Sequence, residues 1–220
     1  AADKIRRRLQ GEPFCGTHYL DDGNHHYMTL FWIEKIKEPF DLVLFDHHTD
    51  MQPAAFLPIL SCGGWVRTAL ETLAYLRKVC LIGPPDMEPD LPDALGRRVR
   101  FVDEQTANTC TFFAPSERPV YLSVDLDILS KKDFSSIWDQ GSMRRERLEN
   151  WIIYLYQKQY LHLSILFQTE IAAHSSLLEE VVYLLAKVHL VHPQGVRPAL
   201  AVAHQIPTVA PEVSLCIAYG

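Results

Sequence analysis

Two short segments of the sequence place metal-binding types of side chain at alternate positions, each directly after an apolar run. The first segment is Asp46-x-His48-x-Asp50, which follows the apolar residues 42–45. Residues two positions apart in an extended backbone point to the same side, so we expect these three side chains to face one way. Two carboxylates and a neutral imidazole are a suitable donor set for Mn, Fe or Zn. The alternative for this segment alone is a polar loop after a strand.

The second segment, Asp125-Leu126-Asp127, follows the apolar residues 119–124. If both apolar runs are strands of one parallel sheet, the two segments meet at the same edge of that sheet. Four aspartates gathered there would repel one another, and burial would raise their pKa values. Divalent cations would remove that conflict, and two cations lower the pKa of a shared water enough to supply hydroxide at neutral pH. The combined pattern therefore predicts a metal centre.

A third element, Gly23-Asn24-His25-His26, lies at the start of an expected helix, upstream of the first segment. Either His25 or His26 could add one more imidazole to the centre. The alternative is a pair of exposed histidines at a helix cap.

Strand-like and helix-like segments alternate along the chain, which is typical of an α/β fold with a mainly parallel sheet and helices on both faces. We expect strands at 17–20, 42–45, 79–83, 99–102, 119–124 and 161–167, with edge strands near 199–203 and 213–218. We expect helices at 25–36, 65–78, 142–157 and 177–188. The sequence shows no repeat or linker, so we predict one domain over residues 1–220.

The composition restricts the partners and the compartment. A formal net charge of −6 argues against nucleic acid or an anionic membrane as the main partner. The hydrolysis predicted below implies a small-molecule substrate. No apolar run is long enough to span a bilayer. The five cysteines are scattered without metal-site spacing, which favours a reducing, cytoplasmic setting. The apolar C-terminal tail is compatible with contact between subunits, so a homo-oligomer stays open.

Taken in order, three motifs resemble those of the arginase/agmatinase (ureohydrolase) family, and the resemblance covers residues 22–170. The motifs are Gly23-Asn24-His25-His26, Asp46-His47-His48-Thr49-Asp50 and Ser123-Val124-Asp125-Leu126-Asp127. The resemblance implies an arginase-like, three-layer α/β/α fold. It also implies two Mn(II) ions with a bridging hydroxide, with Fe or Zn as alternatives.

Transferred motif by motif, the resemblance also implies the metal ligands. One ion would be held by His25, Asp46, Asp50 and Asp125. The other would be held by Asp46, His48, Asp125 and Asp127. Asp46 and Asp125 would then bridge the two ions.

The sequence departs from the family pattern at several positions. Asn24 replaces the usual Asp of the first motif, and Gln52 takes the position of an Asn. Residues 61–65, Ser-Cys-Gly-Gly-Trp, stand where the family carries a histidine-containing loop, so the proton-shuttling histidine of arginase has no counterpart. Glu170 is the candidate for the acid that binds the substrate. His174, near Glu170, is a candidate acid or base, with an ordinary helix-start histidine as the alternative.

Two further features concern the pocket and the reaction. Residues 138–141, Trp-Asp-Gln-Gly, follow the second metal segment and could form a pocket wall or an ordinary loop. The function we predict is manganese-dependent hydrolysis of a linear C–N bond in a guanidino or related amidino or amide substrate. The alternatives are a single-zinc, deacetylase-like hydrolase that uses the histidine pair 25–26, and a catalytically inactive metal-binding protein.

Overall fold

The computed structural model describes residues 2–12, 16–20, 23–53, 59–85, 90–113, 118–157, 164–168 and 215–217. Within them lies a seven-stranded sheet in which every hydrogen-bonded pair of strands is parallel, so the predicted α/β fold is confirmed. The strands are β1 (Gly16–Leu20), β2 (Phe40–Phe45), β3 (Leu76–Ile82), β4 (Val99–Val102), β5 (Val120–Asp125), β6 (Ser164–Gln168) and β7 (Leu215–Ile217).

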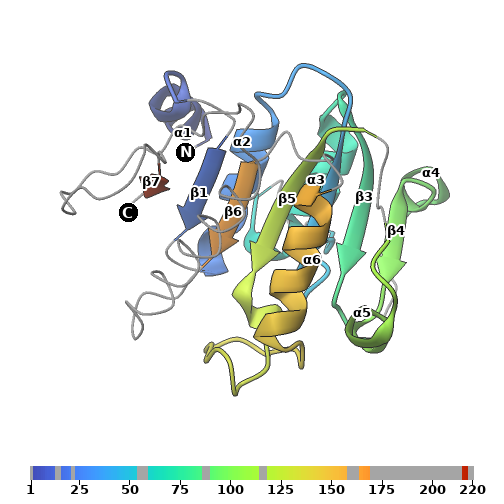
Figure 1. Cartoon of the computed structure of the whole chain (residues 1–220). Helices are drawn as coiled ribbons and strands as arrows, with labels where there is room; N and C mark the ends of the chain where they lie inside the picture. The colour runs from blue at the N-terminus through green and yellow to red at the C-terminus, as the bar shows by residue number, and fades with distance from the viewer. Residues whose placement is uncertain are drawn as a thin grey trace, which may run out of the picture.

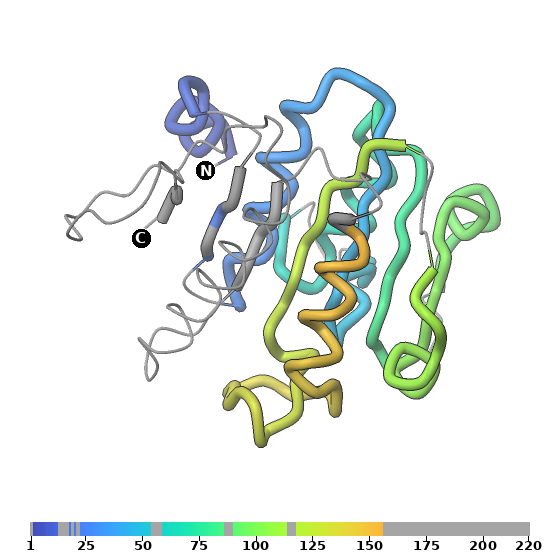
Figure 2. Tube along the Cα trace, viewed as in Figure 1, coloured from blue at the N-terminus to red at the C-terminus, as the bar shows by residue number. Residues whose placement is uncertain are grey.

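Helices cover both faces of this sheet. Helix α6 (Arg145–Gln157) lies on one face, and α2 (Met28–Ile33) and α3 (Trp65–Thr72) lie on the other (Figure 1). The remaining short elements are α1 (Ala2–Leu9), α4 (Asp93–Gly96), α5 (Glu104–Thr109), and the 3-10 turns η1 (Gly23–His25), η2 (Cys62–Gly64) and η3 (Leu126–Ile128). The tube in Figure 2 follows the same path through the three layers. No helix among the described residues is both long enough and apolar enough to cross a membrane.

Strand β2 is buried on both faces because its side chains are apolar on both. Val43 and Phe45 pack in the core under α6, whereas Leu42 and Leu44 pack in the core under α2 and α3. All four are fully buried, and each such side chain contributes about 1.5–3 kcal/mol of hydrophobic stabilisation. The continuous apolar run of a central parallel strand therefore fixes β2 in the middle layer.

The strand order is β4-β3-β2-β5-β6-β1-β7. After β2 the chain adds β3 and β4 on one side and then returns to place β5 on the other side of β2. The boundary between β2 and β5 is therefore the point where the strand order changes direction. In open α/β sheets, ligands bind at such a point, beyond the carboxyl ends of the strands.

Several helix boundaries differ from the sequence-based expectation. The helix expected at 65–78 ends at Thr72, because Leu76–Ile82 pairs with β2 and β4 as a strand. The helix expected at 25–36 is reduced to η1 and the six residues of α2. The expected helix at 177–188 and strand at 199–203 lie outside the described residues.

Candidate metal centre

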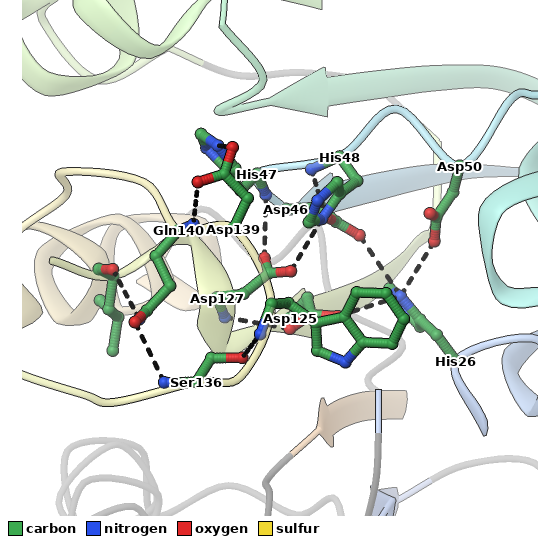
Figure 3. Close-up of polar contacts among 12 residues, drawn as sticks. His26, Asp46, His47, His48, Asp50, Asp125, Asp127, Ser136, Asp139 and Gln140 are labelled. Atoms are coloured by element: carbon green, nitrogen blue, oxygen red, sulfur yellow. Dashed lines mark hydrogen bonds and ion pairs between the residues drawn. The ribbon is translucent and has the colours of Figure 1, made fainter. Parts of the chain in front are cut away.

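The candidate centre forms where β2 and β5 end. The two strands pair in register, with Phe45 opposite Val124, so the residues that follow each strand start from neighbouring positions. Asp46 and Asp125 are therefore brought together, at the edge predicted from the sequence. Figure 3 shows the cluster, in which side chains from both strands converge with His26, which follows η1.

One group of potential ligands consists of His26, Asp46 and Asp125, all buried. The Nδ1 atom of His26 lies 3.3 Å from Oδ2 of Asp46 and 3.5 Å from Oδ2 of Asp125. It also lies 3.1 Å from Oδ2 of Asp50. Three carboxylates thus face a single imidazole nitrogen.

A second group consists of Asp46, His48 and Asp127. The Nδ1 atom of His48 lies 2.8 Å from Oδ2 of Asp127 and 3.6 Å from Oδ1 of Asp46. Within each group, one ligand atom per residue lies within 4.8 Å of the others. Asp46 belongs to both groups, so the arrangement is consistent with a binuclear site that shares this carboxylate.

Backbone amides hold one oxygen of each aspartate in these two groups. The amides of His48, His47 and Asp127 donate to Oδ1 of Asp46, Asp127 and Asp125, at 2.6, 3.1 and 3.0 Å. The Oδ2 atoms then face the histidines. Oδ2 of Asp46 is buried, and its 3.3 Å contact with Nδ1 of His26 lacks hydrogen-bond geometry, so this oxygen has no hydrogen bond with the described residues. A buried carboxylate oxygen in that state is costly, and a cation would satisfy it, so the residues present fit a metal centre.

In the protein without metal, the pKa shifts of these residues also arise from their burial and from the closeness of several carboxylates. Burial raises the pKa of Asp125 well above its usual range, and repulsion by Asp127 and Asp46 raises it further. Burial would lower the pKa of His26, but the carboxylates of Asp46 and Asp50 outweigh it and raise that pKa well above the ordinary value. Hydrogen bonding to Asp127 raises the pKa of His48 to about 11. Protons therefore neutralise this cluster when no cation does, and metal binding would displace them.

The structure selects His26 rather than His25 as the histidine that faces the aspartates. His25 is only partly buried, and its ring meets Tyr27 edge-on at a centroid distance of 6.1 Å. His26 is buried, and its Nε2 lies 3.0 Å from Oγ of Ser123. The sequence-based choice of His25 is corrected accordingly. Adjacent residues in a tight turn point in different directions, and only contacts with distant strands decide which one enters the site.

Asp50 lies beside the centre but belongs to neither ligand group. Its Oδ2 accepts a hydrogen bond of 2.6 Å from Nε1 of Trp65, a contact that sequence reasoning missed. Its backbone is left-handed, with φ of 50°, which is uncommon outside glycine. The contact of Ser123 with His26 was also missed. Its signal was the period of two, because Ser123 lies two residues before Asp125 on the same face of β5.

The two candidates for substrate chemistry, Glu170 and His174, lie outside the described residues. The expected 138–141 segment is described, and the ring of Trp138 meets the ring of His48 edge-on at a centroid distance of 6.5 Å. This segment therefore lies next to the second ligand group.

Comparisons with known proteins agree on the fold. No model of a known protein family matches the sequence. An uncharacterised protein of Thermotoga maritima is 35% identical over 135 residues, which is 61% of this chain and only 50% of that protein. The agmatine ureohydrolase of Thermoplasma volcanium superposes with a TM-score of 0.64 at 16% identity, covering 86% of this chain and 66% of that one. The arginase of Bacillus cereus superposes with a TM-score of 0.61 at 14% identity, covering 88% and 75%. The predicted arginase-like fold is thus confirmed, at low sequence identity.

Proposed function

We propose that this chain, which has the fold of the arginase/agmatinase (ureohydrolase) family, is a metal-dependent hydrolase. Its substrate would carry a linear C–N bond in a guanidino or related amidino or amide group. The observation that carries the proposal is the buried carboxylate of Asp46, which both ligand groups share and whose Oδ2 makes no hydrogen bond with the described residues. Its position at the carboxyl ends of β2 and β5 is where α/β sheets bind ligands.

In this proposal, one Mn(II) ion would be held by His26, Asp46 and Asp125, and a second would be held by Asp46, His48 and Asp127, with Fe or Zn as alternatives. When bound, such a pair of cations lowers the pKa of a water molecule and polarises the carbon under attack.

The surrounding residues position the histidine ligand. Ser123 lies at Nε2 of His26, which leaves Nδ1 directed at the carboxylates. Trp65 donates to Asp50, which keeps that carboxylate beside the same nitrogen. Outer contacts of this kind commonly fix the orientation of a histidine ligand and tune it. Glu170 is proposed to bind the substrate and His174 to act as acid or base.

We further propose a reducing, cytoplasmic setting and a small-molecule substrate. Support for the setting comes from Cys62, Cys80 and Cys110, which are free thiols. Burial raises the pKa of the Cys80 thiol to about 12, so it remains a protonated core residue. Assembly into a homo-oligomer is proposed from the apolar tail of the sequence alone.

The test is metal content together with turnover. Purified protein incubated with Mn(II) and then desalted should retain about two equivalents, and Asp46→Asn should lose both because both groups need this carboxylate. Asp103→Asn, outside the centre, is the matched control and should retain them. Urea or ammonia release from a set of guanidino, amidino and amide compounds would then identify the reaction. Retention of one zinc would favour the deacetylase-like alternative, and no retained metal would refute the proposal.

A further inference from the structure

His47 is the histidine of the 46–50 segment that neither ligand group uses. Its side chain is only 9% exposed. Each nitrogen of its ring faces a carboxylate oxygen from another part of the chain. Nδ1 lies 3.8 Å from Oε2 of Glu104, and Nε2 lies 3.6 Å from Oδ2 of Asp139. These three side chains therefore form a second cluster beside the end of β2.

Glu104, the first residue of α5, is held in place by contacts at both its backbone and its side chain. Its amide donates to the carbonyl of Pro84 at 3.0 Å, and its Oε1 accepts from the amide of Ser142. Ser142 is fixed in turn, because Nδ2 of Asn108 donates to its Oγ at 3.0 Å. The Glu104 side chain is 19% exposed, and its second oxygen, Oε2, is the one that faces His47.

The gap between His47 and Glu104 has the spacing of two metal ligands. Nδ1 of His47 is buried and makes no hydrogen bond with the described residues. Its 3.8 Å distance from Oε2 of Glu104 is longer than the roughly 2.7–3.2 Å of a direct N–H···O hydrogen bond. Two zinc bonds of about 2.1 Å place their donor atoms about 3.4 Å apart at a tetrahedral angle, and farther apart at wider angles. An ion between the two atoms therefore fits this gap better than a direct bond does.

Asp139 faces the other nitrogen of the same ring. The loop that carries it is fastened by Gln140, whose side chain makes three hydrogen bonds to backbone atoms of the neighbouring residues. The amide of Gln140 donates to Oδ1 of Asp139 at 3.1 Å, and Oδ2 is directed at His47 (Figure 3). A carboxylate at one nitrogen of a histidine favours the tautomer that leaves the other nitrogen free to bind a metal.

We infer that His47 and Glu104 form an ancillary zinc site, with Asp139 as the outer partner of the histidine. Nδ1 of His47 and Oε2 of Glu104 would be the protein ligands, and water would complete the coordination. A neutral imidazole and a carboxylate suit Zn(II). Mn(II) lies at the weak end of the affinity order for such ligands, so a site with two protein ligands would lose it on desalting.

This inference goes beyond the proposed function, because neither ligand of the ancillary site belongs to the two proposed manganese sites. The ancillary site nevertheless adjoins the centre through the backbone. The amide of His47 donates to Oδ1 of Asp127 at 3.1 Å. A zinc ion bound by His47 and Glu104 would therefore link α5 to the residue that orients Asp127.

The first test counts the zinc ions bound by the full chain in calorimetric titrations. The unaltered protein should bind one equivalent more than Glu104→Gln, which keeps an Oε1 acceptor for Ser142 but lacks the second carboxylate oxygen. His47→Ala should lose the same equivalent. Asp139→Asn should weaken its binding by about tenfold, as is typical when the outer partner of a metal ligand is removed. Glu146→Gln, at a 64% exposed glutamate in the first turn of α6, is the matched control and should keep it.

The second test locates the ion by anomalous diffraction at the zinc edge, with crystals of the full chain grown in Zn(II). We expect a peak between Nδ1 of His47 and Oε2 of Glu104. Zinc found only at the two ligand groups of the centre would overturn the inference. Equal numbers of zinc ions bound by the unaltered protein and by Glu104→Gln would do the same.

Mn(II) retention, measured on every variant, separates this inference from the proposed function. Glu104→Gln should retain about two equivalents of Mn(II), because the proposed manganese ligands are unchanged. A chain that retains no Mn(II) but binds zinc at His47 and Glu104 would refute the proposed function and support the ancillary site. If His47→Ala does not fold, Glu104→Gln decides the question.

Discussion

Replacing Asp125 with asparagine removes one buried negative charge from the centre while preserving the shape of the side chain. The hydrogen bond from the amide of Asp127 is retained, because an asparagine Oδ1 also accepts. In the metal-free protein, the charge at Asp125 is opposed by burial and by Asp127 and Asp46. We therefore expect Asp125→Asn to stabilise the metal-free protein and to weaken its stabilisation by Mn(II).

The sign of the pH dependence follows from the direction of the pKa shifts. The pKa of Asp125 is raised above 3.8, so the folded state holds its proton more tightly than the unfolded state does. Stability is therefore lost as pH rises from that value towards the raised pKa. The pKa of His48 is raised from 6.5 to about 11, so its contribution is complete below 6.5 and is lost as pH rises through 11. Both groups make the metal-free protein less stable at higher pH.

The substitution and Mn(II) binding should each change the melting temperature by several degrees. At a pH where Asp125 is ionised, its buried and repelled charge costs about 1–3 kcal/mol, the penalty of a buried group without full compensation, and the substitution removes that cost. Mn(II) at about one hundred times its Kd adds about 2.7 kcal/mol for one site. Each kcal/mol moves the melting temperature of a chain of this size by about 2–4 °C. Asp125→Asn should therefore melt about 2–12 °C higher in EDTA, and the original protein should gain about 5–11 °C from Mn(II).

Thermal unfolding in EDTA and in Mn(II), at about pH 6 and about pH 8, measures how the substitution, the metal and pH each change the melting temperature. The metal-free difference should be larger at the higher pH, where the carboxylate is more fully charged. Asp103→Asn, which retains the capping oxygen of α5, should change neither curve. The reasoning is wrong if Asp125→Asn melts below the original protein in EDTA at the higher pH. It is also wrong if Mn(II) raises the melting temperature of Asp125→Asn as much as that of the original protein.

Three further substitutions test the parts that support the centre. Gly83 has φ of 122°, and a Cβ atom there would lie 2.6 Å from the carbonyl oxygen of Asp46. Gly83→Ala should therefore lower the free energy of unfolding in urea by about 2–4 kcal/mol and lower the affinity for Mn(II). Unchanged values would contradict the close packing. Trp65→Phe removes the indole N–H that donates to Asp50 and should cost about 1–3 kcal/mol in the same assay, with a loss in Mn(II) affinity measured by calorimetry. Asp103→Ala removes the cap of α5 and should cost about 1 kcal/mol in urea unfolding, whereas Asp103→Asn should cost little.

The part of the site that could be predicted from the sequence is the part built by strands. An apolar run followed by alternate carboxylates fixes both the strand and the face on which its ligands lie, because the period of two is a local property of the backbone. Asp46, directly after β2, and Asp125, the last residue of β5, were placed this way, whereas His48 lies in a bend and Asp127 in η3, where the backbone is no longer extended. The alternation of strand-like and helix-like segments also indicated the parallel sheet that brings the residues after β2 and those after β5 together.

The remainder depended on contacts between distant segments. Nothing local distinguishes His25 from His26, and the choice is made by Ser123 and the aspartates against which one ring packs. The end of α3 was missed because Leu73 and Leu76 continue its apolar spacing, although the backbone at Leu73 is already extended. The strand expected at 79–83 therefore begins earlier, at Leu76, where pairing with β2 rather than local periodicity decides the conformation.

The adjacency of β2 and β5 would also determine when this protein could take up the ions proposed for it. The two strands are neighbours in space, but β3 and β4 intervene between them in the chain, so they pair only after a long loop has closed. Each proposed ion takes ligands from both sides of this boundary, so a chain in which β2 and β5 have not yet paired lacks at least one ligand for each ion. Manganese uptake would then mark the completion of the central sheet, and its rate after dilution from denaturant would follow the slowest topological step of folding.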